Sequence, residues 1–239
     1  MVGFCKKVLI ADTVAPLADA AFAIKNPSMM DAWLGTIAYT IQLFFDFSGY
    51  TDMAIGLALM IGFVFPQNFN DPYTSKSITE FWQRWHMSLS SWLREYLYIP
   101  LGGNKKGTRR TYINLFLTML LGGLWHGANW TFVVWGAWHG GILAIERYLK
   151  SKFGDSILPS WLRIIKTMLL VMIGWIFFRA IDLDNALQML RGLIGLNGFD
   201  FSNMMQWQIE PDRLGILFVA IFLVYAMPWL HRYRGGPMR

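Results

Sequence analysis

Apolar residues occur along the chain in long blocks that contain few charged side chains. A helix needs about 20 predominantly apolar residues to cross the hydrocarbon core of a membrane, which is roughly 30 Å thick. Four regions approach or exceed this length, namely 32–66, 111–145, 161–178 and 214–230. Because the first two are long enough to be split, about five or six spanning or re-entrant helices are expected. The pattern predicts an all-α fold, a polytopic transmembrane helical bundle that forms one domain over residues 1–239.

Charged residues at the ends of these regions predict the orientation of the chain. Basic residues flank region 111–145 on both sides: Lys105, Lys106, Arg109 and Arg110 before it, and Arg147, Lys150 and Lys152 after it. The positive-inside rule places both groups on the cytoplasmic side, so this region should enter the membrane and return as a hairpin. Region 161–178 would then cross outward and leave Asp182 and Asp184 outside, and region 214–230 would return the chain to a basic tail at 231–239.

Residues 77–100 have the pattern of an amphipathic helix. Ser77 and Glu80 form a capping-box pattern at its start, and Pro100 provides a stop. At helical spacing, apolar and polar side chains fall on separate faces, and His86 lies on a strip between them. We expect this helix to lie in the membrane interface or to enter the membrane partway.

Composition is typical of a membrane protein and excludes several other classes. Hydrophobic residues make up 55% of the chain and charged residues only 15%. The net charge of +6 arises from basic residues beside apolar regions, so nucleic acid is not an expected partner. Cys5 is the only cysteine and allows neither an intramolecular disulfide nor a cysteine-based zinc site. The sequence contains no HExxH metal motif and no GxSxG serine motif.

Candidate chemistry centres on His126, which lies in the segment LLGGLWHGANWTF at residues 120–132. About 15 residues, or roughly 22 Å of helix, separate it from the basic loop, which is less than a full crossing. The nearby glycines and Asn129 disfavour a helix, and freed backbone groups at this depth need partners from protein or a water-filled cavity. His126 is therefore expected to line such a cavity. Because a neutral imidazole accepts a proton, a general base is one interpretation, and a packed histidine or a proton-pathway residue are the others.

Two carboxylates, Asp46 and Asp52, lie within apolar sequence in the segment FFDFSGYTDMAIG. Carboxylates at such depth normally face a bundle interior or a cavity. They either line the same cavity as His126 or cap or bend a helix around Ser48 and Gly49. The sequence leaves both interpretations open.

Two further histidines are assigned no catalytic role. His139 follows His126 by 13 residues and would face the opposite side of a helix, so we expect it to pack against a neighbouring polar group. His231 lies in the basic tail and is expected to be solvated.

Several of these segments occur together in one protein family. The chain resembles the membrane-bound O-acyltransferase family in QNFNDPYTSKSITEFWQRWHMSLSSWLREYLYIPLGGNKKG and, further along, in GGLWHGANWTFVVWGAWHG. It is most similar to the branch that O-acetylates bacterial alginate, and also resembles the branch that transfers D-alanine in teichoic acid synthesis. The similarity runs from about residue 3 to about residue 180, and the chain looks like the C-terminal half of a family member.

The resemblance implies a set of site residues around a tunnel. His126 takes the position of the family's catalytic histidine, and His86 takes that of its second motif histidine. In this interpretation, His126 takes the proton of an acceptor hydroxyl that attacks a thioester, or assists transfer through an acyl relay. His86 and Arg84 orient the donor or polarise its carbonyl. The remaining motif positions and candidate donor- or tunnel-lining residues are Trp85, Asn68, Pro72, Tyr73, Asp46, Asp52 and Asn129.

The resemblance also implies substrates, partners and a location. The expected donor is acetyl-CoA or an acyl-carrier thioester on the cytoplasmic side, with no bound cofactor. The expected acceptor is an extracytoplasmic polysaccharide such as alginate. Membrane lipid and periplasmic acetyl-transfer proteins are expected partners, in the bacterial cytoplasmic (inner) membrane. The alternatives are D-alanyl or other acyl transfer to a cell-wall polymer, a proton or solute transporter, and a scaffold for a modifying complex.

Overall fold

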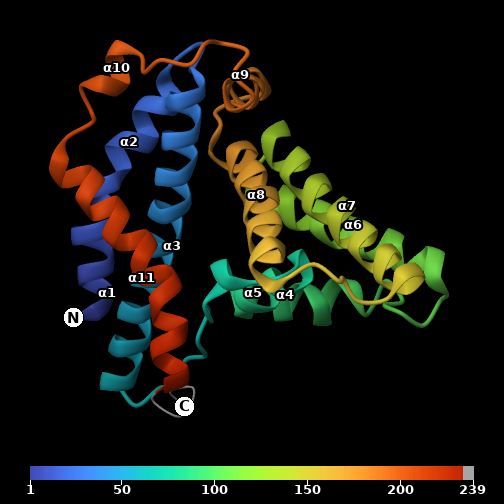
Figure 1. The fold of residues 1–239 in the computed structure, drawn as a ribbon. Coiled ribbons are helices and arrows are strands. Elements are labelled where there is room, and N and C mark those ends of the chain that lie inside the picture. Colours follow the sequence, from blue (N-terminus) through green and yellow to red (C-terminus); the bar gives the residue numbers. More distant parts are fainter. Residues whose placement is uncertain (234–239) are drawn as a thin grey trace. The chain divides into compact units, whose positions relative to one another are not determined.

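Helices and loops make up the described part of the chain. The computed structural model describes residues 1–233, with the side chains of residues 1–228, and this part contains no strand. The basic tail with His231 lies outside the described side chains. The chain divides into two compact units, Met1–Thr74 with Asp184–Arg239, and Ser75–Leu183. The all-α fold is confirmed (Figure 1), and the single domain stays a prediction.

Two helices in the described residues are long and apolar enough to cross a membrane. They are α8 (Ser160–Arg179) and the segment Pro211–Pro228 of α11 (Pro211–Tyr233). These match the third and fourth apolar regions of the sequence. The first two regions also form long helices, in which polar residues such as Asp46 and Asn114 lower the mean hydropathy. Two of the predicted spans are thus supported by length and composition.

The first unit is built around α3 (Met29–Met60), a helix of 32 residues. The N-terminal arm, comprising α1 (Val2–Cys5), the π-helical η1 (Lys6–Ala11) and α2 (Asp12–Ala23), packs along it. The arm and α3 meet at glycines, because a Cβ atom on Gly49 would lie 2.7 Å from the carbonyl oxygen of Gly3. Because α3 continues without a break through Ser48 and Gly49, the first apolar region forms one helix. The expected split of this region is therefore not found. The unit is completed by η2 (Pro72–Thr74), α9 (Leu183–Leu193), α10 (Asn203–Gln206) and α11, which packs on α2 and α3.

The start of α3 is fixed by a local capping box and by a backbone amide of a distant segment. The amide of Asp31 donates to the hydroxyl of Ser28 (3.2 Å), and the amide of Ser28 donates to the Asp31 carboxylate (3.1 Å). This capping box satisfies two of the free amide groups at the helix start. The same carboxylate accepts from the amide of Ser202, which ties the segment before α10 to α3. Asp31 is fully buried, so these bonds compensate for its desolvation.

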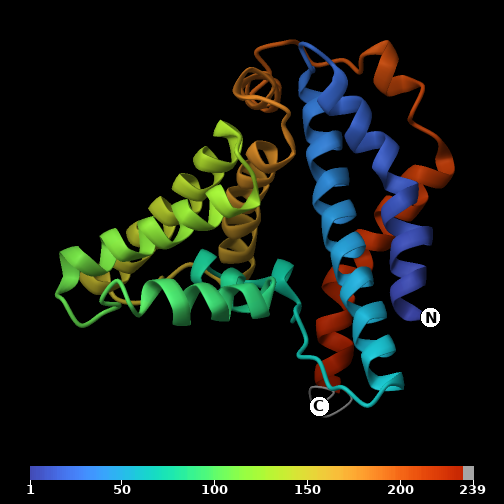
Figure 2. The same cartoon turned by 180° about the vertical axis from the view of Figure 1, so that it is seen from behind.

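The second unit contains the predicted hairpin. Helices α6 (Thr108–His126) and α7 (Trp130–Phe153) run antiparallel, side by side, and residues 127–129 join them (Figures 1 and 2). Glycines permit the close approach, because a Cβ atom on Gly136 would lie 2.5 Å from the carbonyl oxygen of Met119. The hairpin brings the basic residues before and at the start of α6, and those at the end of α7, to one end of the helix pair, as the positive-inside argument requires.

The amphipathic segment differs from its prediction. Residues 77–100 form three short helices, α4 (Ile78–Arg84), α5 (Met87–Leu93) and the π-helical η3 (Arg94–Tyr98). The break lies at Trp85, which is extended, and at His86, which is left-handed with φ 43° and ψ 58°. The break lets Trp82 and Trp85 both enter the core of the unit, while Trp92 remains exposed. The single continuous helix was therefore a wrong prediction, because burying these large rings outweighs helical continuity.

Candidate functional site

The ring of His126 lies in an aromatic surround at the tip of the hairpin. It ends α6 and is half-buried. Its centroid lies 5.1 Å from that of Trp135 and 5.0 Å from that of Phe178, both edge to face, and 6.2 Å from that of Phe132. Within the described residues no hydrogen bond engages the ring nitrogens of His126. An imidazole nitrogen without a partner can accept a hydrogen bond or a proton.

His86 lies close to His126 although 40 residues separate them in the sequence. Burial, and secondarily the charge of neighbouring His126, lowers the pKa of His86 to about 4. The imidazole of His86 is therefore neutral near pH 7, and one of its nitrogens carries a proton that it can donate. The two motif histidines predicted from the sequence thus belong to one neighbourhood of the second unit.

A chain of aromatic rings connects the two motif segments. Trp85 lies 5.0 Å from Trp175, Trp175 lies 5.8 Å from Phe178, and Phe178 lies 5.0 Å from His126, measured between ring centroids. Trp85 and Trp175 are almost completely buried. Their large fixed surfaces hold the segment around His86 against the hairpin tip.

Arg84 precedes these residues on α4 and is held by its own helix. Its guanidinium lies 2.7 Å from the carboxylate of Glu80, one helical turn earlier. The hydroxyl of Ser77 caps α4 by accepting from the amide of Glu80 (3.0 Å), as predicted. The Glu80 carboxylate accepts from the amide of Lys76 (2.7 Å) and not from that of Ser77, so the capping box is only half formed.

Asn129 closes the hairpin loop through both of its amide atoms. The side-chain oxygen accepts from the amide of Thr131 (3.1 Å) and so caps α7. The side-chain nitrogen donates to the carbonyl of Ile181 (2.8 Å), just beyond α8. Asn129 therefore fixes the loop that follows His126, and its tunnel-lining role stays a prediction.

His139 is a packed histidine, as expected. It is fully buried, and its Nδ1 accepts from the indole N–H of Trp82 (3.3 Å). A Cβ atom on Gly174 would lie 2.5 Å from its Nε2, so α8 presses directly against the ring. Among the described residues there is no group of three or more His, Cys, Asp and Glu side chains placed to hold a metal ion.

Glu146 is a residue that sequence reasoning missed. It lies on α7, and its carboxylate accepts from the backbone amides of Ile78 (2.9 Å) and Thr79 (3.1 Å) at the start of α4. The Thr79 hydroxyl adds a third contact at 3.3 Å, and Lys166 lies 3.8 Å away. No local pattern in the sequence pairs this glutamate with a helix start 68 residues earlier.

The two acidic candidates of the first unit form ion pairs with the N-terminal arm. Asp52 lies 2.7 Å from Lys6, and Asp46 lies 2.7 Å from Lys7, which also contacts Asp12 at 2.8 Å. Neither carboxylate caps or interrupts α3. The sequence could not show these pairs, because lysines beside an apolar segment read as orientation signals.

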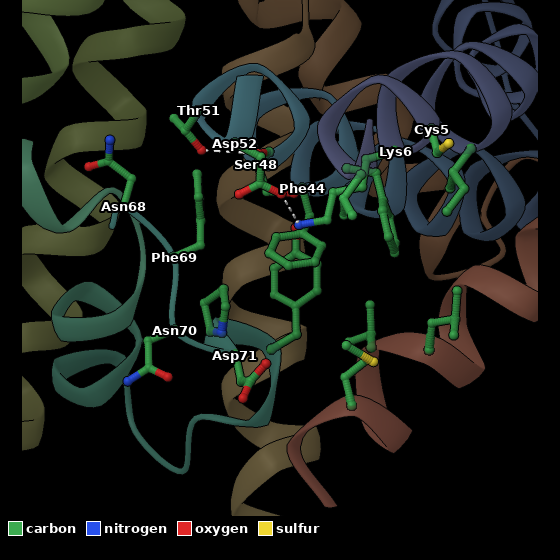
Figure 3. A pocket seen from close by; sticks show the side chains of 18 of the residues that line it. Cys5, Lys6, Phe44, Ser48, Thr51, Asp52, Asn68, Phe69, Asn70 and Asp71 are labelled. Atoms are coloured by element: carbon green, nitrogen blue, oxygen red, sulfur yellow. Dashed lines mark hydrogen bonds and ion pairs between the residues drawn. The ribbon is translucent and has the colours of Figure 1, made fainter. Parts of the chain in front are cut away.

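A cavity of about 610 Å³ lies within the first unit (Figure 3). Asp52 and Asn68 line it together with Lys6. Further side chains of α3, of the segment 67–73, of α11 and of the N-terminal arm form the rest of its wall. The Lys6–Asp52 ion pair forms part of this wall. Asp46 is not among the lining residues. The first unit thus unites four residues of the candidate set, Asp52, Asn68, Pro72 and Tyr73, and a cavity shared with His126 stays a prediction.

Comparison with known proteins matches residues 1–183 to the model of the membrane-bound O-acyltransferase family. The chain is 54% identical over 238 residues to a probable alginate O-acetylase of Azotobacter vinelandii. The matched region covers 100% of this chain and 47% of that relative. It is 42% identical over 232 residues to a peptidoglycan O-acetyltransferase of Helicobacter pylori, covering 95% and 44%. A teichoic acid D-alanyltransferase of Bacillus subtilis is 35% identical over 135 residues, covering 54% and 34%. The chain spans about half the length of the first two relatives.

Proposed function

Because the chain belongs to the membrane-bound O-acyltransferase family, we propose that it transfers an acetyl group from a thioester to hydroxyl groups of an extracytoplasmic polysaccharide. The names of its relatives support this proposal, because alginate, peptidoglycan and teichoic acid are the polymers they contain. Alginate is the first candidate acceptor, given the 54% identity to the Azotobacter relative. Transfer of D-alanine or another acyl group is the alternative within the same chemistry.

The proposal extends to the setting of the reaction. The donor is acetyl-CoA or an acyl-carrier thioester that approaches from the cytoplasmic side. The acceptor and the acetyl-transfer proteins that complete the modification lie on the other side of the bacterial cytoplasmic membrane. A site that brings donor and acceptor together replaces a bimolecular encounter with fixed geometry, which is itself a large catalytic contribution.

The observation that carries the proposal is the setting of His126. Its ring is half-buried among Trp135, Phe178 and Phe132, and its nitrogens have no hydrogen-bond partner within the described residues. A histidine that only stabilised the fold would hydrogen-bond through a ring nitrogen, as His139 does with the indole of Trp82. His126 instead presents a free acceptor at the hairpin tip, beside the second motif histidine.

The reaction follows from a neutral imidazole at this position. A ring nitrogen of His126 accepts the proton of the acceptor hydroxyl as the oxygen attacks the thioester carbonyl carbon. The new C–O bond forms, the C–S bond breaks, and the imidazolium returns its proton to the departing thiolate. General-base catalysis of this kind contributes roughly 10²–10⁴-fold to the rate.

His86 is placed to assist at the carbonyl oxygen. Because its pKa is lowered to about 4 by burial and by neighbouring His126, it is neutral and has one N–H donor at pH 7. Donation of that hydrogen bond would stabilise the negative charge that develops on the oxygen during attack. Arg84, held by Glu80, lies two residues away and is proposed to orient the donor.

Substitution of His126 tests the proposal. In the protein as the cell encodes it, His126→Ala is expected to lower polymer acetylation at least about 100-fold, because the base is lost. The amount of protein in the membrane, measured by immunoblot, should not change. Mass spectrometry of the polymer identifies the ester as acetyl or D-alanyl. Acetylation at the wild-type level in His126→Ala would refute the assignment.

A further inference from the structure

Contacts along α4 and α7 have a regular order. At the start of α4, Thr79 contacts Glu146, and three residues later Trp82 contacts His139 through a hydrogen bond and Trp135 through ring packing at 5.6 Å. As α4 advances, its partners on α7 therefore move backward through 146, 139 and 135. The helix α4 runs antiparallel to α7 and leads toward the end of α7 where the His126 ring contacts Trp135.

Glu146 anchors the far end of this arrangement. A helix of seven residues, such as α4, is not stable alone and leaves its first amide groups without intrahelical partners. Glu146 accepts from the first two of these amides, and its negative charge interacts favourably with the positive end of the helix dipole. Only 15% of the Glu146 side chain is exposed, so its bond to the Ile78 amide is partly shielded from solvent, whereas its contacts with Thr79 are exposed. Without Glu146, the amide of buried Ile78 would lose its partner, and the exposed amide of Thr79 would turn to solvent.

We propose that Glu146 is a positioning residue that sets the place of His86 relative to His126. This inference rests on the proposed function. Glu146 lies 11 residues from Trp135, or about 16 Å along α7, and so acts through α4 and not on reacting atoms. The hydrogen bonds at Glu146 and His139 fix α4 at two points along α7. The helix then delivers His86, just beyond its end, to the ring of His126.

Substitutions at Glu146 test the inference through the rate of acetyl transfer. Glu146→Ala is expected to lower kcat at least about tenfold with little change in the donor KM, because a displacement near 1 Å can cost 10²-fold in rate. Glu146→Gln keeps one acceptor oxygen, so its kcat should lie between those of the wild type and the alanine variant. An order other than wild type, glutamine, alanine contradicts the inference.

Two control substitutions distinguish the effect on kcat of losing the α4 cap bonds from the effect of removing a charge near α7. Asp155→Ala removes an exposed carboxylate just after α7, which forms an ion pair with Lys150. Lys166→Met removes the cation near Glu146 and leaves the cap bonds in place. Both variants should keep kcat within about twofold of wild type. If Lys166→Met lowers kcat as much as Glu146→Ala, the ion pair and not the cap is responsible, and the inference fails.

A measurement that needs no enzymatic activity follows the titration of His86. The chain contains four histidines, so NMR of protein labelled at histidine gives few signals, and the signal lost in His86→Asn identifies His86. In the wild type, the pKa of His86 should be about 4. In Glu146→Ala and Glu146→Gln it should rise toward 6.5, because release of α4 exposes the ring to water.

The combined results separate this inference from the proposed function. If His126→Ala abolishes acetylation while both Glu146 variants keep full kcat, the inference is overturned and the function stands. If His126→Ala keeps acetylation, the proposed function fails, and the His86 titration still decides whether Glu146 positions that ring. Loss of kcat in Glu146→Gln with an unchanged His86 titration would place the effect elsewhere and overturn the inference.

Discussion

His86 combines two unfavourable features in one residue. Its backbone is left-handed, which costs a residue with a Cβ atom roughly 1–2 kcal/mol, and its ring is partly buried beside another histidine. Strained residues of this kind cluster at functional sites. The sequence did not reveal the strain, because RWHMS has no glycine or asparagine to mark a left-handed position. The burial of Trp82 before the break and of Trp85 at the break accounts for the strain.

The lowered pKa of His86 predicts how stability depends on pH. Its pKa is about 4 in the folded protein and about 6.5 in an unfolded chain. Between these values the unfolded chain binds more protons, so stability falls as the pH decreases from about 6.5 to 4. His86→Asn removes the titration and tolerates the left-handed backbone. The midpoint of thermal unfolding in detergent should therefore decrease more in the wild type than in His86→Asn over this window. Parallel curves for the two proteins would contradict the prediction.

Elements were predictable where one local signal decided them. The run without charged residues, the glycines and the flanking basic residues predicted the hairpin of α6 and α7, and its turn lies beside His126 as expected. The prediction of one helix over 77–100 failed because the helical periodicity is interrupted at Trp85 and His86. Packing of Trp82 against Trp135 and of Trp85 against Trp175 decides the path of the backbone there. Such contacts join segments more than 50 residues apart, and no local pattern encodes them.

Alanine substitution at two helical glycines should have opposite effects on stability, because only one of them lies at the contact between α7 and α8. Gly174→Ala would place a methyl group 2.5 Å from the Nε2 of fully buried His139, which cannot move aside. The expected loss is about 1–3 kcal/mol. Gly141 on α7 has open space at its Cβ position, so Gly141→Ala should raise stability by up to about 1 kcal/mol through helix propensity. Thermal unfolding of both variants checks the pair, and equal midpoints would contradict it.

At the scale of the whole molecule, the candidate residues fall into two compact units. His86, Arg84, Trp85, His126 and Asn129 belong to the second unit, whereas Asp52, Asn68 and Asp46 belong to the first. The sequence pointed to His86 and His126 because both occupy motif positions of a known family. The roles of the aspartates could not be predicted, since their partners are the lysines of an N-terminal arm that folds back on α3. Long-range ion pairs depend on the fold and leave no periodic trace in the sequence.

The orientation of the chain yields a test by cysteine labelling. With Cys5→Ser as background, Lys105→Cys and Lys152→Cys place thiols in the basic segments at one end of the hairpin. A membrane-impermeant maleimide should label both in inverted vesicles and neither in intact spheroplasts, because the positive-inside rule makes this end cytoplasmic. Asp184→Cys should show the reverse pattern. Labelling of either lysine position from outside would reverse the assigned topology.

The cap on α4 also bears on how related chains can change in length. His139 and Glu146 are seven residues apart, which is about two turns of α7. One inserted residue between them would rotate Glu146 by about 100° around the helix and carry its carboxylate away from α4. The exposed loop 154–159 between α7 and α8 has no such constraint. As homologous chains diverge, insertions and deletions should accumulate in that loop and be eliminated from the stretch between these two residues.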